Sequence, residues 1–95
     1  MAAYAIFIRE STRDASELDA YSQRAGGTLA GHPVSVLAAY GRHEVLEGPE
    51  VEGVVILEFP TIDEAKAWYD SPAYREAREH RFKGADYRAV IVEGL

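Results

Sequence analysis

The sequence predicts a single α+β domain of the ferredoxin-like type, a βαββαβ chain that forms a four-stranded antiparallel sheet. Four short runs are apolar or alternating, with the β-branched composition typical of strands. Helix-capping patterns and helically spaced apolar residues separate the first run from the second and the third from the fourth. Since strand, helix and strand follow one another twice, the order is that of the split βαβ motif. A chain of 95 residues supports one hydrophobic core, so we predict one domain over residues 1–95.

The first predicted strand is Ala3–Ile8, which carries apolar side chains on both of its faces. A helix should follow, because Asp14 and Glu17 are spaced as in a capping box. Its apolar positions keep helical spacing to about Leu29. The pair Gly26-Gly27 lies within this span and costs roughly 1 kcal/mol per residue relative to Ala, so the helix is expected to fray or end there.

The second predicted strand is the long extended segment Ser35–Leu46, in which Gly41 is a candidate bulge or bend. Glu47–Glu50 is turn-like in composition. The third strand is Val54–Phe59, a run of mainly apolar residues that Pro60 ends. Two extended segments joined by a short turn predict a β-hairpin.

The last third of the chain predicts two helices and a strand. Thr61–Glu64 fits a capping box at the start of the first helix. Ser71-Pro72 ends that helix and begins the next, because serine is a good N-cap and proline suits the first helical position. Gly84 is a candidate terminator of the second helix. Tyr87–Glu93 alternates and then becomes apolar, which predicts a strand buried on both faces.

The composition is that of an ordinary globular protein, with 47% hydrophobic and 27% charged residues. A net charge of −6, with Arg and Lys scattered among the acids, argues against a nucleic-acid partner. No apolar run approaches the roughly 20 residues that span a bilayer. The N-terminus lacks the basic and apolar segments of a signal peptide. We therefore expect a cytoplasmic protein without a membrane partner.

Metal and cofactor chemistry have little support in the sequence. There is no cysteine, which excludes disulfides and thiolate ligands. The three histidines, His32, His43 and His80, lack the spacing of a metal site. Neither a phosphate-binding loop nor a dinucleotide fingerprint is present, so we expect neither a metal nor a cofactor.

Each predicted strand offers apolar side chains to both sides of the sheet. If the helices cover one face only, a monomer would expose an apolar patch well above the roughly few hundred Å² that monomers tolerate. Pairing two sheets face to face in a two-fold homodimer would bury that patch. Alternation does not show which face carries the helices. Glu58 shares a face with Val54 and Ile56, so it lies either under the helices or on the open side.

Several segments resemble a known family. They are Val45–Gly48, Val55–Pro60, Tyr69–Tyr74 and Val90–Gly94. In order and spacing they resemble the domain of unknown function 1330 (DUF1330) family of the dimeric α+β barrel superfamily, and the resemblance covers essentially the whole chain. It implies a ferredoxin-like protomer and a homodimer whose sheets form a barrel. The superfamily includes cofactor-free monooxygenases and isomerases, whereas the family has no generally established reaction. This chain carries Ala39-Tyr40-Gly41 where family members often have Arg-Gly-Gly, so a role for that Arg does not carry over.

Glu58 and His43 are the candidate catalytic residues. Glu58 is a carboxylate within an apolar strand, so it should have an Arg, His or Tyr partner and is placed to transfer a proton. A structural ion pair or a hydrogen-bonded strand end is the commoner reason for such a residue. His43 is the candidate general base, because imidazole titrates near neutral pH. An exposed histidine of the hairpin is the alternative.

The candidate ligand-binding residues are aromatic side chains of the last helices and strand, together with one cation. They are Trp68, Tyr69, Tyr74, Arg81 and Tyr87. Aromatic walls with a single cation suit a flat aromatic or carboxylated ligand held between the sheet and the helices. An aromatic stripe at helical spacing is more often part of the core, which is the alternative for Trp68.

Three functions remain open at this point. The first is a dimer that binds a small organic molecule between sheet and helices. The second is a cofactor-independent monooxygenase or isomerase, in which His43 or Glu58 is the base and Arg81 or tyrosines orient the substrate. The third is an interaction dimer without a ligand. A titratable group sealed in a pocket would favour the enzyme, an apolar pocket without one the binding protein, and the lack of a pocket the interaction dimer.

Overall fold

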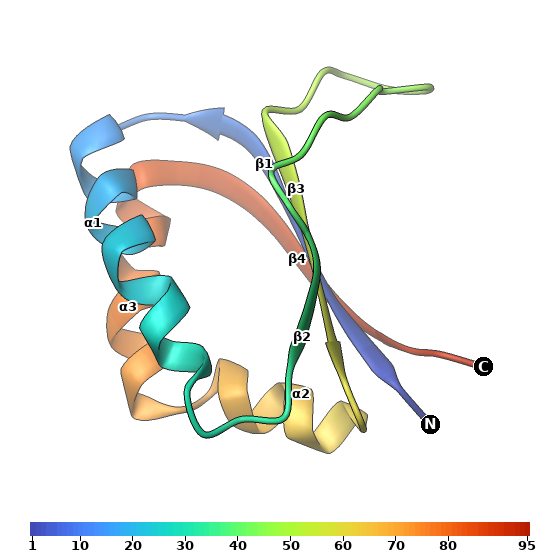
Figure 1. Cartoon of the computed structure of the whole chain (residues 1–95). Helices are drawn as coiled ribbons and strands as arrows, with labels where there is room; N and C mark the ends of the chain where they lie inside the picture. The colour runs from blue at the N-terminus through green and yellow to red at the C-terminus, as the bar shows by residue number, and fades with distance from the viewer.

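The computed structural model describes residues 1–95, and its four strands form one sheet in the order β2-β3-β1-β4. All neighbouring strands are antiparallel. The helices lie on one side of the sheet and leave the other side uncovered (Figure 1). The elements are β1 (Ala3–Thr12), α1 (Ala15–Ala25), the 3-10 helix η1 (Gly26–Leu29), β2 (Ser35–Ala39), β3 (Gly53–Phe59), α2 (Ile62–Tyr69), α3 (Pro72–Gly84) and β4 (Ala85–Glu93). The predicted ferredoxin-like α+β fold is confirmed.

β1 and β2 differ most in length from the prediction, whereas β3 and β4 begin only slightly earlier than predicted. β1 runs further, to Thr12, because it keeps pairing with β4 as far as Ala85. The predicted end of the second strand is wrong, because β2 stops at Ala39 rather than at Leu46. Residues 40–52 instead form a loop that projects from the sheet on the uncovered side (Figure 1). The short turn predicted between the second and third strands is therefore a long loop, although β2 and β3 do pair as expected.

Tyr40 marks the end of β2. Its φ of 58° lies in the left-handed region, which is uncommon for a residue other than glycine. The Tyr40 ring lies against Gly53, where a Cβ would collide with it. Its hydroxyl hydrogen-bonds the Tyr87 hydroxyl of β4 at 2.5 Å. Contacts with two distant strands therefore hold the turn that the sequence suggested at the neighbouring Gly41.

The three predicted N-caps are present. The Asp14 carboxylate accepts from the amides of the first turn of α1. Thr61 Oγ1 accepts from the Glu64 amide at 3.1 Å, and Ser71 Oγ accepts from the Tyr74 amide at 3.4 Å. α1 ends before the glycine pair, as expected, and continues as a 3-10 turn. None of the helices has the length and apolar character that crossing a membrane requires.

The capping box predicted at Asp14 is only half formed. The Glu17 carboxylate reaches α3 instead, where it hydrogen-bonds His80 Nδ1 at 2.6 Å. The Asp14 amide donates to the Gly84 carbonyl at 3.0 Å. Gly84 is the last residue of α3, as predicted, but its φ is not left-handed. Glycine is required there for close packing, because a Cβ would lie 2.7 Å from the Leu18 amide nitrogen.

The core lies between the helices and one face of the sheet. Its eight buried members are Ala5, Phe7, Leu57, Phe59, Ala65, Trp68, Tyr74 and Ala77. The register pairs Ala5 with Leu57 and Phe7 with Val55, so β1 and β3 present these side chains to the helices together. The helices contribute aromatic rings to the same core. The Trp68 ring packs edge-on against the Phe7 ring, with centroids 5.9 Å apart.

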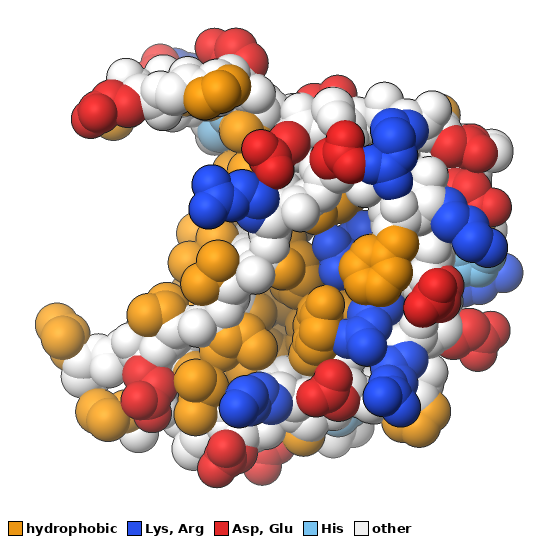
Figure 2. Space-filling model, turned by 180° about the vertical axis from the view of Figure 1, so that it is seen from behind, with side chains coloured by type: hydrophobic (Ala, Val, Ile, Leu, Met, Phe, Trp, Pro, Cys, Tyr) orange, Lys and Arg blue, Asp and Glu red, His pale blue; other side chains and the backbone are white.

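The other face of the sheet is open and apolar. Ile6 of β1 lies directly between Ile56 of β3 and Val90 of β4. Figure 2 shows hydrophobic side chains on this concave side, between the projecting loop and the chain termini. Glu58 lies on this open face beside Tyr4, so it points away from the helices. The structure thereby settles the question that alternation left open.

Candidate ligand-binding site

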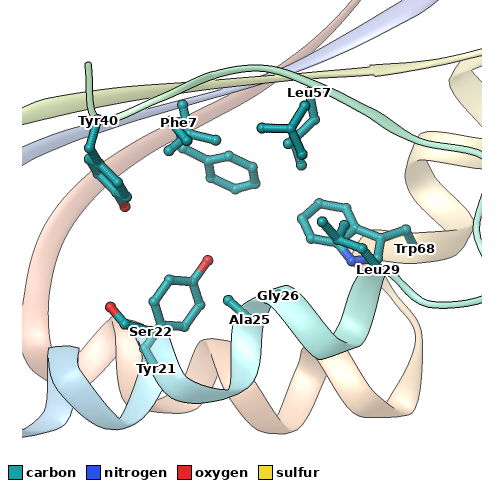
Figure 3. A pocket seen from close by; sticks show the side chains of 12 residues that line it. Phe7, Tyr21, Ser22, Ala25, Gly26, Leu29, Tyr40, Leu57 and Trp68 are labelled. Atoms are coloured by element: carbon teal, nitrogen blue, oxygen red, sulfur yellow. The ribbon is translucent and has the colours of Figure 1, made fainter. Parts of the chain in front are cut away.

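A partly open cavity of about 350 Å³ lies between the sheet and α1. It is lined by Phe7, Tyr21, Ser22, Ala25, Gly26, Leu29, Val36, Ala39, Tyr40, Val55, Leu57 and Trp68. Figure 3 shows the side chains of the sheet on one wall and those of α1 and η1 on the other. The volume falls within the range of roughly 300–1,000 Å³ that is usual for small-molecule pockets.

Small side chains on one face of α1 and η1 create this space. Ala25 and Gly26 lie three and four residues after Ser22, so all three share the helical face that points toward the sheet. They are too short to reach Phe7 and Leu57 on the opposite wall. A Cβ added to Gly26 would meet no atom within 4 Å. The cavity therefore exists because this face of the helix carries small residues.

Trp68 closes one end of the cavity and is held firmly. The side chain is only 2% exposed, and its ring stacks on Phe59 with centroids 5.7 Å apart. Its indole Nε1–H donates to Thr28 Oγ1 at 3.1 Å. The Thr28 hydroxyl in turn donates to the Ala25 carbonyl at 2.6 Å. Trp68 Nε1 and Thr28 Oγ1 both have hydrogen-bond partners, so the indole ring is held in one orientation.

Two pairs of tyrosine hydroxyls mark the other end. Tyr21 Oη lies 2.8 Å from Tyr74 Oη, and Tyr40 Oη lies 2.5 Å from Tyr87 Oη. Tyr21 and Tyr40 point their hydroxyls into the cavity from opposite walls (Figure 3). Tyr74 and Tyr87 stand behind them and do not line the space. Each hydroxyl that faces the cavity is therefore hydrogen-bonded to a second one behind it.

Burial raises the pKa of Tyr21 and of Tyr40 well above the usual value for tyrosine, and their tyrosine neighbours add to the rise. Guanidinium groups oppose part of this effect. The Arg81 charge lowers the pKa of Tyr21, and Arg9, 4.9 Å from the centroid of the Tyr40 ring, lowers that of Tyr40. Both hydroxyls are therefore protonated at neutral pH, and each has one proton to donate.

Arg81 is a cation buried behind the tyrosines. It is only 3% exposed, and its guanidinium carbon lies 5.0 Å from the Tyr87 ring centroid and 5.4 Å from that of Phe7. None of the ion pairs in the chain includes it, and its Nε has no hydrogen-bond partner. Burial raises the pKa of Tyr74, and the positive charge of Arg81 opposes the rise.

The structure brings four of the five predicted ligand-binding residues to this region, in different places. Trp68 is part of the cavity wall. Tyr74 is fully buried and reaches the cavity only through its hydrogen bond to Tyr21. Tyr87 reaches it only through Tyr40, and Arg81 lies behind both pairs. The alternative that Trp68 belongs to the core also holds, because the same ring does both.

The fifth predicted residue, Tyr69, faces away from the cavity. It borders a separate hollow beside β4 with Ala89 and Ile91. Its ring lies under the guanidinium of Arg78, whose carbon is 4.4 Å from the ring centroid. Tyr69 therefore contributes to packing outside the cavity rather than to its wall.

The two candidate catalytic residues also lie outside the cavity. His43 is exposed in the loop, not on a strand, and its Nε2 lies 3.0 Å from the Val51 carbonyl. Glu58 lies near the far end of β3 on the open face, opposite Tyr4 of β1, and raises the pKa of the Tyr4 hydroxyl. Tyrosine is one of the partner types predicted for Glu58. His43 and Glu58 are thus near opposite ends of β3. No group of three or more His, Cys, Asp or Glu residues is placed to hold a metal ion.

Sequence reasoning missed Tyr40 and Thr28 as parts of the site. Tyr40 was placed within a strand, and only the three-dimensional contact with Gly53 and Tyr87 turns it inward. Thr28 gave no signal beyond being a small polar residue near the end of a helix. The spacing of Ser22, Ala25 and Gly26 was a usable signal, because small residues on a core-facing helical stripe leave space.

Comparison with known proteins identifies a family and a fold. The model of the family described as domain of unknown function (DUF1330) matches residues 2–95. Among curated proteins, none matches the sequence. A similar solved structure is a protein of unknown function from Rhodopseudomonas palustris, with 22% identity, a TM-score of 0.73, and coverage of 99% of this chain and 82% of that one.

Two further solved structures are similar over nearly their whole length. One is a dimeric protein of unknown function with a ferredoxin-like fold from Bacteroides fragilis, with 14% identity, a TM-score of 0.69, and coverage of 98% of this chain and 96% of that one. The other is SnoaB, a cofactor-independent oxygenase from Streptomyces nogalater, with 9% identity, a TM-score of 0.62, and coverage of 99% and 93%. At these identities the likeness shows the fold alone.

Proposed function

The chain belongs to the DUF1330 family, matched over residues 2–95, and from this premise we propose that it binds a small organic molecule in the cavity between the sheet and α1. The observation that carries the proposal is the cavity itself. It has a usual ligand-pocket volume, a wall that is mostly apolar or aromatic, and a few polar groups at one end. This combination suits a flat carbon skeleton with one polar group.

Binding is favoured over catalysis by the chemistry of the wall. The only titratable side chains that line the cavity are Tyr21 and Tyr40, and burial raises the pKa of both. A general base for neutral pH needs a pKa near that pH, which neither phenol has. The candidate bases His43 and Glu58 lie elsewhere. The cavity thus offers recognition without an evident proton acceptor.

The test compares two neighbouring glycines of η1. A Cβ at Gly26 or Gly27 meets no atom within 4 Å, and neither residue has a left-handed φ, so both positions tolerate a side chain. Only Gly26 lines the cavity. Native mass spectrometry of the purified protein, before and after gentle denaturation, should reveal a small bound mass in the parent. Gly26→Leu should lose that mass because leucine fills the space, whereas Gly27→Leu should keep it.

If the natural ligand is lost during purification, a second measurement can still detect binding to the cavity. Trp68 is the only tryptophan and part of the wall, so its fluorescence should change when a small aromatic compound binds. Retention of the bound mass by Gly26→Leu would place the ligand elsewhere. No bound mass, together with no fluorescence response to a panel of aromatic acids, amides and hydrocarbons, would leave the interaction dimer as the better proposal.

We also propose that the chain forms a homodimer through its open face. The support is the apolar row of Ile6, Ile56 and Val90 on that face, together with the description of the Bacteroides fragilis protein as dimeric. Burying such a row against its copy removes apolar area from water. The measurement is the mass in solution over a range of concentrations, and a constant monomer mass would contradict the proposal.

A further inference from the structure

A buried guanidinium without an ion-pair partner lies behind the tyrosine end of the cavity. No Asp or Glu lines the cavity, although the chain as a whole has a net charge of −6. Arg81 is buried behind this end, and no carboxylate lies within ion-pair distance of it. Buried guanidinium groups are normally paired, because an isolated buried charge is costly. Glu10 and Asp86 border a separate hollow with Arg81, but neither carboxylate lies within ion-pair distance of the guanidinium. The buried cation therefore has no ion-pair partner within the chain.

The tyrosine hydroxyls at this end can donate to an oxygen in the cavity. Tyr21 Oη lies 2.8 Å from Tyr74 Oη, and either hydroxyl can be the donor of that bond. When Tyr74 donates, the Tyr21 proton is free for the cavity, into which its hydroxyl points (Figure 3). The guanidinium carbon of Arg81 lies 5.4 Å from the ring centroid of Phe7, which lines the cavity, so its positive charge favours an anionic group there.

We propose that this end of the cavity binds an ionised oxygen of the ligand, a carboxylate or a phenolate, which accepts a hydrogen bond from Tyr21 Oη and takes its counter-charge from Arg81. Tyr40 Oη faces the same oxygen from the opposite wall. The inference rests on the proposed binding function and adds the chemical class of the ligand. Trp68 and the apolar wall hold the carbon skeleton, so the ligand is a flat aromatic or conjugated acid. Arg81 does not line the cavity and acts through its charge alone, so it is a positioning residue.

The test compares 2-naphthoate with 2-naphthamide, which have nearly the same size and differ in charge. Isothermal titration calorimetry at neutral pH, on protein freed of any bound mass, should give roughly tenfold tighter binding of the acid, because hydrogen bonds to charged groups are the stronger kind. Tyr21→Phe and Arg81→Met should bind both compounds about equally. Tyr4→Phe, on the open face, and Arg78→Met, one turn away on α3, are the matched controls and should keep the preference for the acid.

4-Nitrophenol tests the phenolate, because its absorbance reports its own ionisation. Bound to the parent it should ionise at a lower pH than in buffer, and Arg81→Met should abolish this shift. A preference for naphthoate without the shift assigns the site to carboxylates, and the shift without the preference assigns it to phenolates. Equal binding of naphthoate and naphthamide, with 4-nitrophenol bound in its neutral form, would overturn the inference while the cavity still binds. If none of the three compounds binds, the proposed function fails instead. Tyr21→Phe keeps the test decisive if Arg81→Met does not fold.

Discussion

Side chains around the cavity are held by polar contacts that join distant parts of the chain. Trp68 donates to Thr28 across 40 residues, Tyr21 meets Tyr74 across 53, and Tyr40 meets Tyr87 across 47. Leaving a buried donor or acceptor without a partner costs about 1–3 kcal/mol. Each contact therefore fixes a ring in one orientation as well as joining two elements. The wall is rigid because its aromatic residues carry polar ends that must be satisfied.

These tyrosines predict a loss of stability at alkaline pH. Burial raises the folded-state pKa of Tyr21, Tyr40 and Tyr74 above the unfolded value of about 10. Below that pH both states are protonated and the free energy of unfolding is unaffected. Above it the unfolded chain releases protons that the folded chain keeps, so the free energy of unfolding falls by up to about 1.4 kcal/mol per pH unit for each fully buried tyrosine. Tyr40 contributes less because it is partly exposed.

Urea unfolding followed by Trp68 fluorescence between pH 9 and 11, roughly the range around the tyrosine pKa, checks this prediction. The stability of Tyr74→Phe should fall less steeply with pH than that of the parent, because one buried phenol is gone. Absorbance of tyrosinate in the native protein gives an independent measurement. Ionisation of all the tyrosines at an ordinary pH without unfolding would contradict the expectation.

At this scale the sequence identified residue types better than residue positions. Trp68 and Arg81 were singled out because a lone tryptophan and a cation among aromatic residues are conspicuous. The role of Tyr21 as the hydroxyl inside the cavity was not found, because it depends on Tyr74 from another helix. The partner of Glu58 was predicted by type, and Tyr4 is of that type. A side chain's chemistry is local information, whereas its surroundings are not.

At the scale of elements, α1 and η1 leave room for the cavity because they carry small residues on the face toward the sheet. α1 brings small residues to the sheet and continues into η1, where Gly26 adds no side chain to the cavity wall. The junction of β1, α1 and α3 fixes how far α1 stands from the sheet. The Gly84 carbonyl at the end of α3 accepts from the amides of Arg13 and Asp14, at 2.8 Å and 3.0 Å. One carbonyl thus joins the start of α1 to the end of α3.

Gly84→Ala should loosen this junction. The added Cβ would lie 2.7 Å from the Leu18 amide nitrogen and 3.2 Å from the Asp14 carbonyl oxygen, both backbone atoms that cannot rotate away. We expect a loss of about 1–3 kcal/mol in the free energy of unfolding, the usual cost of overpacking. Gly27→Ala is the control, because a Cβ there meets nothing within 4 Å. It should be neutral, or stabilising by up to about 1 kcal/mol.

Urea denaturation of the three proteins measures these differences. Equal stability of Gly84→Ala and the parent would mean that the junction moves to admit a methyl group, and that it does not set the position of α1. A loss of stability in Gly27→Ala would point to a backbone requirement in η1 that its φ does not reveal.

Helix starts could be predicted from the sequence because a cap is a local device. Asp14, Thr61 and Ser71 each accept from amides within three residues. The end of β2 could not, because it depends on a left-handed Tyr40 that is held by Gly53 and Tyr87. The sequence up to Leu46 is compatible with an extended strand. In the folded sheet, however, the pairing of β2 with β3 ends at Ala39.

At the scale of the whole molecule, the sheet separates two surfaces with different chemistry. The helix side holds the cavity with its tyrosines and Arg81. The open side is an apolar row beside Glu58 and Tyr4. Alternation along each strand supplies both surfaces, so an apolar open face was predictable, whereas its assignment to one set of residues was not. Because the cavity walls come from one protomer, a dimer through the open face leaves the cavity complete.

Val90→Asp should therefore break the dimer without emptying the cavity. Val90 lies in the apolar row beside Ile6 and is 53% exposed in the single chain, so the protomer tolerates a carboxylate there. A two-fold interface would bury two such carboxylates, and the cost of several kcal/mol for each unpaired charge should shift the protein to a monomer at micromolar concentration. Phe82→Asp is the matched control, because Phe82 is 47% exposed but lies on α3, on the far side of the sheet.

Native mass spectrometry and sedimentation equilibrium distinguish the two variants. Phe82→Asp should remain dimeric, and the Val90→Asp monomer should still bind 2-naphthoate more tightly than 2-naphthamide. A Val90→Asp protein that dimerises as strongly as the parent would move the interface off this face. Loss of naphthoate binding in a folded Val90→Asp monomer would mean that the partner chain completes the cavity, because no residue that lines it was changed.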